Sequence, residues 1–138
     1  MVQRIFPWGD AIESNLANYS ESEIGSASAL GCFPAGRSPY GAMDLCGNVW
    51  EWTPSLWGRP DQALDFPYPY VATDGREDAM APPGAARVVR GGSWNYDHHL
   101  ARASYRFRYH PNYRLVSLGF RLVVSSPISP VPLAAGAA

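Results

Sequence analysis

The stretch SPYGAMDLCGNVWEWT (Ser38–Thr53) carries the pattern that decides the fold of this chain. It opens with turn-forming Ser, Pro and Gly residues and closes with tryptophans at every second position. Successive side chains of an extended chain point to opposite faces, so Trp50 and Trp52 share one face, and Val49 and Glu51 share the other. The spacing therefore predicts an extended segment that anchors aromatic side chains.

Around this stretch, glycine and proline interrupt the chain every few residues. The 138 residues include 13 glycines and 13 prolines, which excludes long helices from most of the sequence. We expect short helices at Asp10–Tyr19 and Asp44–Asn48. Pro54–Ala86 is rich in Pro, Asp and Gly, and it predicts a long ordered loop region.

Strand patterns are clearest in the last third of the chain. RVVRGGSW (Arg87–Trp94) contains a β-branched pair, ARASYRFR (Ala101–Arg108) alternates with a period of two, and GFRLVV (Gly119–Val124) is apolar. Together these segments predict an irregular α+β domain over residues 1–124. The tail, residues 125–138, is rich in Pro and Ala, and we expect it to be extended or loosely attached.

Aromatic and charged side chains are the expected fasteners of such a loop-rich domain. We expect each of five indole rings to be buried, with its N–H donated to a loop carbonyl: Trp8, Trp50, Trp52, Trp57 and Trp94. Arg121 lies between Phe120 and Leu122 and needs an acidic partner, either Glu51 or Asp44. Cys32 and Cys46 do not form a CxxC pair, and we expect two buried free thiols.

The overall charge of the chain excludes two classes of partner. The net charge is −1, so no strong field attracts nucleic acid or anionic lipid. No apolar run approaches the roughly 20 residues that a membrane-spanning helix needs, so we expect no membrane insertion. The first ten residues lack the apolar run of a signal peptide. We therefore expect a cytoplasmic protein, or an exported one if a further segment precedes this sequence.

Three motifs in order, SPYGAMDLCGNVWEWT, RVVRGGSW and LGFRLV, resemble the family of the formylglycine-generating enzyme, the sulfatase-modifying domain. FPWGD and ANYSESEIGSASALGCFPAGRSPYG fit the same family upstream, so the resemblance covers Phe6 to Val123. It implies a C-type-lectin-like fold, with a small twisted antiparallel sheet, short helices and long ordered loops. The fold family also often carries a structural calcium ion, and Asn48 and Glu51 offer suitable oxygen ligands. We expect no other cofactor to be required.

The enzymatic activity of the family depends on residues that this chain lacks. The resemblance implies a pair of cysteines between the GGS-type and GFR motifs, which bind copper as soft thiolates. Ser93–Leu118 contains no cysteine. We therefore expect no formylglycine synthesis and no catalytic residues. The remaining metal alternative is a site of two histidines and the carboxylate of Asp97.

The segment between RGGSW and GFR has an unusual composition. Its clusters contain Asn, Tyr, Asp, His, Phe, Leu, Val and Ser, and each of these can arise from the codon AAC by changes at adenines only. Lys, Glu, Gln, Met and Trp cannot arise in this way, and none occurs from Asn95 to Val124. This resembles the variable region of a diversity-generating retroelement protein, here at about residues 95–118. The fixed-looking arginines between the clusters (Arg102, Arg106, Arg108 and Arg114) then belong to the frame.

A mixture of Tyr, His, Asn, Asp and Ser is typical of a binding surface. The sequence therefore predicts a non-enzymatic protein that binds a macromolecular ligand, most favourably a protein surface. The alternative is an oxygenase of the formylglycine-generating-enzyme family, or an inactive paralogue. We expect Tyr96, His98, Tyr109, Tyr113 and Val116 to form one exposed, shallow patch. The predicted ligand-binding residues are Tyr96, Asp97, His98, His99, Phe107, Tyr109, His110, Asn112, Tyr113, Leu115, Val116 and Ser117.

Overall fold

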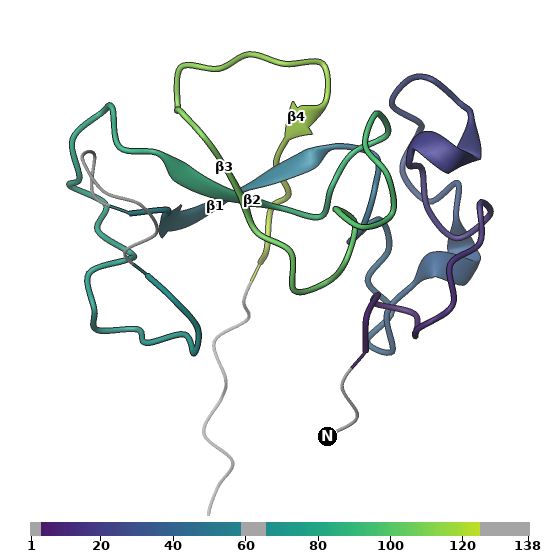
Figure 1. Ribbon diagram of the computed structural model, residues 1–138, viewed down its shortest axis with the longest axis horizontal. Helices are drawn as coiled ribbons and strands as arrows, with labels where there is room; N and C mark the ends of the chain where they lie inside the picture. The colour runs from purple at the N-terminus through teal and green to yellow at the C-terminus, as the bar shows by residue number, and fades with distance from the viewer. Residues whose placement is uncertain (1–3, 59–65, 125–138) are drawn as a thin grey trace, which may run out of the picture.

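A four-stranded sheet lies at the centre of the molecule, with strand order β3-β2-β1-β4 (Figure 1). The computed structural model describes residues 4–58 and 66–124. The predicted tail, residues 125–138, lies outside the described residues. The strands are β1 (Trp50–Leu56), β2 (Arg87–Arg90), β3 (Phe107–Tyr109) and β4 (Leu118–Gly119), and two short 3-10 helices are η1 (Ser20–Ser22) and η2 (Pro34–Gly36).

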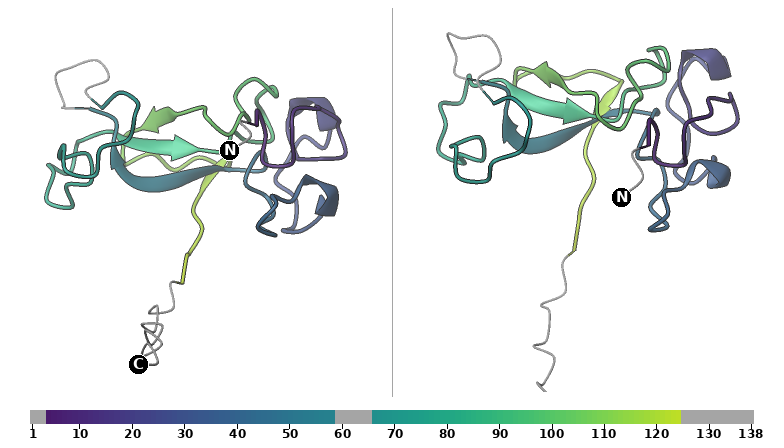
Figure 2. Two further views of the ribbon diagram at one scale, coloured as in Figure 1. Left: turned by 90° about the horizontal axis from the view of Figure 1, so that it is seen from below. Right: turned by 60° about the horizontal axis from the view of Figure 1, so that its bottom comes forward.

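Long loops flank this sheet at both ends. The N-terminal loops with η1 and η2 lie at one end, and the loop that follows residue 66 lies at the other (Figures 1 and 2). The fold is thus α+β and C-type-lectin-like, with little regular structure. One detail differs from expectation: β1 pairs with β4 in parallel, so the sheet is mixed. The β3–β4 connection makes this possible, because it carries the chain past both β2 and β1 to the far edge of the sheet.

Both predicted helices are wrong. Asp10–Tyr19 forms turns, and η1 begins only at Ser20. In Asp44–Asn48 the two end residues have φ values of 54° and 61°, which a right-handed helix does not allow. Local backbone hydrogen bonds and contacts with distant segments override the weak helical pattern here.

The predicted strands exist but are shorter than the patterns suggested. Ala101–Tyr105 forms turns, in which the Tyr105 amide donates to the Arg102 carbonyl at 2.9 Å, so only the end of the predicted strand Ala101–Arg108 belongs to β3, which lies at the edge of the sheet. After Gly119 the chain leaves the sheet, and Leu122 is exposed. The loop predicted to begin at Pro54 begins three residues later in the structure, because β1 runs to Leu56. Proline is tolerated there because β4 no longer pairs and the β1–β2 register shifts.

Trp50 lies at the centre of the core, fully buried against the face of the sheet. The expectation that indole N–H groups bond to loop carbonyls holds for Trp8, which donates to Ala11 at 2.8 Å. It is wrong for Trp50, Trp57 and Trp94, whose buried N–H groups have no hydrogen-bond partner among residues 4–58 and 66–124. These rings are therefore held by packing and not by hydrogen bonds.

The Gly47–Asn48 pair joins distant segments of the chain. The Asn48 amide donates to the Asn18 carbonyl at 2.7 Å, the Gly47 amide donates to the Gly91 carbonyl at 2.7 Å, and Trp94 donates to the Asn48 carbonyl at 2.9 Å. Gly47 has a φ of 76°, and a Cβ there would lie 2.4 Å from the Asn18 oxygen. Only glycine permits this approach of two backbones.

Arg121 fastens the end of the sheet. It donates to both oxygens of Glu51, at 2.6 Å and 2.5 Å, which confirms one of the two expected partners. Asp44 contributes only its backbone carbonyl, at 2.6 Å.

Within the two described ranges, the chain has no helix long and apolar enough to cross a bilayer.

Candidate binding surface

β3 divides the predicted variable segment between the two faces of the sheet. Phe107 and Tyr109 pair with Val89 and Arg87, and they lie together on the face that also carries Trp50. The arginines at 106 and 108 alternate with them and point to the opposite face. Strand geometry thus separates the predicted binding residues from the predicted frame.

Four aromatic rings from separate parts of the variable segment form a row that begins at Trp50. Tyr96 and Phe107 lie 5.8 and 5.7 Å from the Trp50 ring, measured between centroids. Tyr109 extends the row at 5.4 Å from Phe107, and Tyr113 follows at 5.7 Å from Tyr109. Edge-to-face and tilted contacts at these distances stabilise aromatic pairs. The turns after Trp94 and after Tyr109 therefore meet over the face of the sheet that carries Trp50.

The row ends in side chains that face solvent. Tyr113 is 52% exposed and Val116 is 83% exposed. With Leu115, Trp52 and Phe120 they line an open groove of about 590 Å³. We call the set Tyr96, Phe107, Tyr109, Tyr113, Leu115 and Val116 the aromatic surface.

Tyr109 sits at the half-buried centre of this surface. Burial raises the pKa of Tyr109 to about 12, and the neighbouring hydroxyl of Tyr96 adds to the increase. The hydroxyl therefore stays protonated over the physiological range. It offers a ligand a neutral donor and acceptor beside apolar rings.

The histidine cluster lies to one side, against η1. His98 Nδ1 is 2.5 Å from Glu21 Oε1, and the rings of His98 and His99 lie 4.1 Å apart. Although loss of solvation raises the pKa of Glu21, hydrogen bonds from the His98 side chain and backbone lower it to about 2. Asp97 is exposed and accepts the His99 amide at 2.8 Å.

The structure therefore brings four of the five expected patch residues together around Trp50 and the groove. His98 is held by Glu21 instead, although the Ser20 amide donates to the Tyr96 carbonyl at 3.0 Å and links the two regions. Ser117 is only 5% exposed, and its carbonyl accepts the Trp50 amide at 2.8 Å, so its side chain does not belong to the exposed surface.

The two remaining cluster residues lie at the edge of the aromatic surface. His110 is half-buried, with its ring 6.3 Å from Tyr113, and Asn112 is exposed. The groove residues that sequence reasoning missed include Trp52 and Phe120, both of which belong to fixed-looking motifs. The alternation in GNVWEW did place Trp52 on the same face as Trp50, which is the signal that could have found it.

The residues proposed for calcium are already engaged. Asn48 Oδ1 accepts the Ser28 amide at 2.9 Å, and both oxygens of Glu51 accept from Arg121. A cation at Glu51 would have to displace the Arg121 guanidinium. The calcium site stays a sequence prediction that this arrangement does not favour.

The cysteines and histidines show no metal-binding arrangement in the described ranges. Cys32 and Cys46 are both free, as expected, but Cys32 is exposed. Loss of solvation raises the pKa of the buried Cys46 to about 12, so the free side chain is a neutral thiol. In residues 4–58 and 66–124, no three His, Cys, Asp or Glu side chains are placed to hold a metal ion. The alternative site of two histidines and Asp97 is therefore not formed.

Comparisons with known proteins agree with this fold. The family model described as "Sulfatase-modifying factor enzyme 1-like domain" matches residues 2–126. "Hercynine oxygenase" from Mycolicibacterium smegmatis is 35% identical over 120 residues, which cover 87% of this chain and 28% of that protein. "Formylglycine-generating enzyme" from Mycobacterium tuberculosis is 31% identical over 143 residues, with coverage of 90% and 46%. The chain thus spans less than half the length of these relatives.

Two solved structures share the architecture. "Treponema denticola variable protein 1" superposes with a TM-score of 0.53 at 28% identity, covering 77% of this chain and 34% of that chain. PvdO from Pseudomonas aeruginosa superposes with a TM-score of 0.55 at 22% identity, covering 83% and 42%. The likeness to PvdO shows the fold alone.

Proposed function

The chain belongs to the sulfatase-modifying factor enzyme 1-like domain family, and on that premise we propose that it is a ligand-binding protein whose aromatic surface contacts a macromolecular partner. One observation carries the proposal. Residues from three clusters within about 95–118 converge on the same face, with Trp50 and Val89 beneath them.

The chemistry of the aromatic surface suits a protein partner. Tyrosine supplies flat contact area and a hydrogen-bonding hydroxyl at low cost in side-chain entropy, and such residues dominate binding energy at interfaces. Tyr113, Leu115 and Val116 are exposed and adjacent, while Phe107 and Tyr109 are held from below. The exposed side chains rest on a layer of buried residues. They can therefore be replaced, and the ligand changed, without a change of fold.

We also propose that a retroelement diversifies these positions. The adenine-accessible residue types between Asn95 and Val124 support this, and so does the likeness to "Treponema denticola variable protein 1". The genome around the gene provides the test. We expect a reverse transcriptase gene and a near-copy of codons 90–123 that differs only where one of the copies has adenine. A locus without such a copy would overturn the diversification proposal.

A binding surface should tolerate substitution. We expect a triple variant, Tyr113→Ser, Leu115→Ser and Val116→Ser, to change the free energy of unfolding by no more than about 0.5 kcal/mol per site, as exposed positions usually do. Urea denaturation measures this directly. The matched control is Val89→Ser, since Val89 is fully buried on the same face and should lose far more stability. Equal losses in the two proteins would place the surface residues in the core.

The second candidate function is oxygenase chemistry, which the 35% identity to hercynine oxygenase favours. The absence of cysteine from Ser93–Leu118 argues against the formylglycine reaction. We expect no aldehyde when the chain is incubated with a sulfatase-type cysteine peptide, copper and O₂, beyond a copper-only control. Mass spectrometry of the peptide measures the product. If the chain forms the aldehyde and a Cys32→Ser, Cys46→Ser variant does not, the oxygenase hypothesis would be supported instead.

A further inference from the structure

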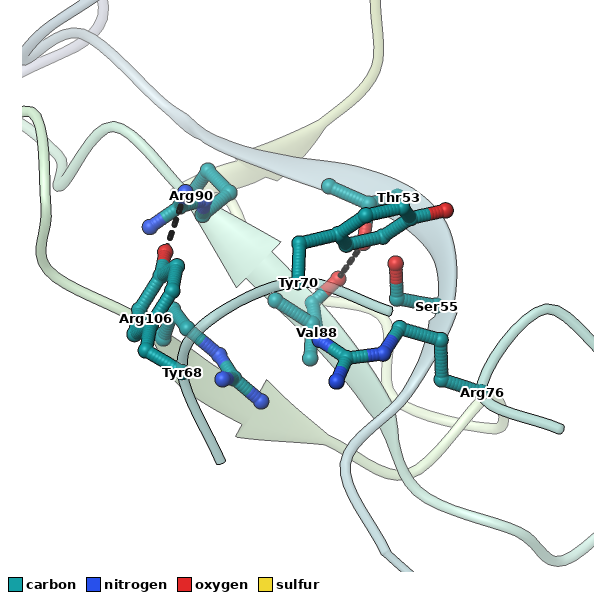
Figure 3. A pocket seen from close by; sticks show the side chains of 8 residues that line it. All are labelled: Thr53, Ser55, Tyr68, Tyr70, Arg76, Val88, Arg90 and Arg106. Carbon is teal, nitrogen blue, oxygen red and sulfur yellow. Dashed lines mark hydrogen bonds between the residues drawn. The ribbon is translucent and has the colours of Figure 1, made fainter. Parts of the chain in front are cut away.

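A second cavity lies on the face of the sheet opposite the aromatic surface. Val88 and Arg90 line it, and they alternate along β2 with Val89, which faces Phe107 (Figure 3). Its volume is about 160 Å³. This is below the roughly 300–1,000 Å³ of sites for drug-sized ligands, so the cavity suits a small ion or a small end group.

Three arginines gather around this cavity: Arg76, Arg90 and Arg106 (Figure 3). Arg76 is neutralised by Asp74, with Nη2 2.6 Å from Oδ2 and Nε donating to both carboxylate oxygens. In the described parts of the chain, Arg90 and Arg106 form no ion pair. Their partners are neutral, so neither positive charge is paired with an acidic group among the described residues.

The hydrogen bonds of these two side chains leave donors free. A guanidinium carries five N–H donors. Arg90 donates to the carbonyls of Ser104 and Tyr105 and to the Tyr68 hydroxyl. Arg106 donates to the Phe66 carbonyl at 2.8 Å, its single hydrogen bond to another described residue. Most of its N–H groups therefore remain available to a ligand.

The position of Arg106 is fixed by aromatic rings. Its guanidinium carbon lies 5.6 Å from the Trp57 ring centroid and 5.2 Å from that of Tyr68. Partial burial lowers the pKa of Arg106, and the positive charges of Arg90 and Arg76 act in the same direction. The rings thus hold a cation where solvation is reduced and neighbouring charges repel it.

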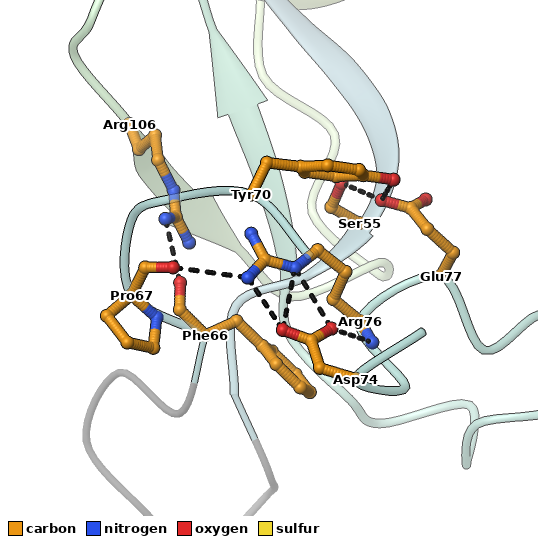
Figure 4. Close-up of polar contacts among 8 residues, drawn as sticks. All are labelled: Ser55, Phe66, Pro67, Tyr70, Asp74, Arg76, Glu77 and Arg106. Carbon is orange, nitrogen blue, oxygen red and sulfur yellow. Dashed lines mark hydrogen bonds and ion pairs between the residues drawn. The ribbon is translucent and has the colours of Figure 1, made fainter. Parts of the chain in front are cut away.

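The acidic groups beside the cavity are already occupied. Figure 4 shows Arg76 and Arg106 reaching the adjacent carbonyls of Pro67 and Phe66, with Asp74 on the far side of Arg76. Glu77 accepts hydrogen bonds from the hydroxyls of Ser55, at 2.5 Å, and of Tyr70, at 3.2 Å. Asp74 is therefore paired with Arg76, whereas Glu77 keeps its charge but forms no ion pair with Arg90 or Arg106 in the described parts of the chain.

We propose that this cavity binds a small oxyanion, held chiefly by the free N–H donors of Arg106 with support from Arg90. Guanidinium groups present paired donors that match the oxygens of phosphate, sulfate or carboxylate. The bound anion would also reduce the repulsion among the three arginines. The site is separate from the aromatic surface and does not depend on the function proposed for that surface.

Calorimetric titration of the full chain with inorganic phosphate, at constant ionic strength, tests the proposal. We expect saturable binding that Arg106→Gln weakens by about tenfold or more, because a charge-assisted hydrogen bond is lost. The matched control is Arg108→Gln. Arg108 also lies over Trp57, at 5.1 Å, but does not line the cavity, so its loss should leave binding unchanged.

The same titration is repeated with acetate and with sulfate. Binding of phosphate and sulfate without acetate would assign a tetrahedral oxyanion, and binding of all three would extend the site to carboxylates. Absence of saturable binding for all three, or an equal loss in the two arginine variants, would overturn the proposal. If Arg106→Gln does not fold, the NMR chemical shifts of backbone amides in the unmodified chain provide the test. Phosphate must then change the shifts of Thr53, Ser55 and Val88. Changes confined to other residues would refute the site.

Discussion

Replacing Trp50 with alanine is expected to lower the free energy of unfolding by about 3–5 kcal/mol, as truncation of a buried aromatic side chain typically does. Trp50 is fully buried and contacts Tyr96, Tyr105 and Phe107. Its removal would leave a cavity directly under the aromatic surface. Urea denaturation followed by circular dichroism measures the loss. Tyr40→Ala is the control, because Tyr40 is 95% exposed and should change stability little.

A second variant at the same position separates packing from hydrogen bonding. The Trp50 indole N–H is buried and has no hydrogen-bond partner in the described part of the chain, so it contributes nothing favourable to the folded state. Trp50→Phe keeps an aromatic ring and removes this group, and it should be clearly more stable than Trp50→Ala. If both variants lose the same stability, packing of the ring against its three aromatic neighbours does not hold the core together.

The second large effect is expected from Gly47→Ala. The added Cβ would meet the Asn18 carbonyl oxygen at 2.4 Å, and that carbonyl already accepts the Asn48 amide. Backbone strain at positive φ costs about 1–3 kcal/mol. Displacement of a buried hydrogen-bonded segment adds to this, so we expect a loss above about 3 kcal/mol.

Gly41→Ala is the matched control for this variant. Gly41 has a φ of 82°, close to the 76° of Gly47, but a Cβ there would have no neighbour within 4 Å. It therefore carries the backbone strain without the collision. The difference between the two variants, measured as free energy of unfolding, reports the close approach of Gly47 to Asn18. Equal losses would mean that the two segments can separate at no cost.

The sequence by itself determined the extended, tryptophan-bearing segment and the family. Period-two alternation is a local property, so GNVWEW predicted that Trp50 and Trp52 share a face, and they do line the same side of the sheet. The sequence also predicted that Arg121 needs an acidic partner, Glu51 or Asp44, because a cation between two apolar residues needs a nearby counter-charge, and the structure shows Glu51. RVVR likewise predicted a strand, and β2 forms there.

The tertiary structure decided everything that depends on contacts between distant segments. The helix predicted at Asp44–Asn48 failed because both end residues adopt positive φ values, and Asn48 does so where it joins distant parts of the chain. The parallel β4 followed from the path of a long connection, which composition does not encode. His98 left the expected patch because Glu21, 77 residues away in sequence, pairs with it.

The two faces of β3 show this division most clearly. The sequence RFRY (residues 106–109) fixes that arginines and aromatic rings alternate, since side-chain direction reverses at each residue of a strand. It does not fix what lies beneath each face. Folding placed Trp50 under Phe107, and it placed Trp57 and the 66–76 loop around Arg106. Those neighbours turn one face into an aromatic surface and the other into a cationic cavity, because burial and charge are set by contacts across the fold.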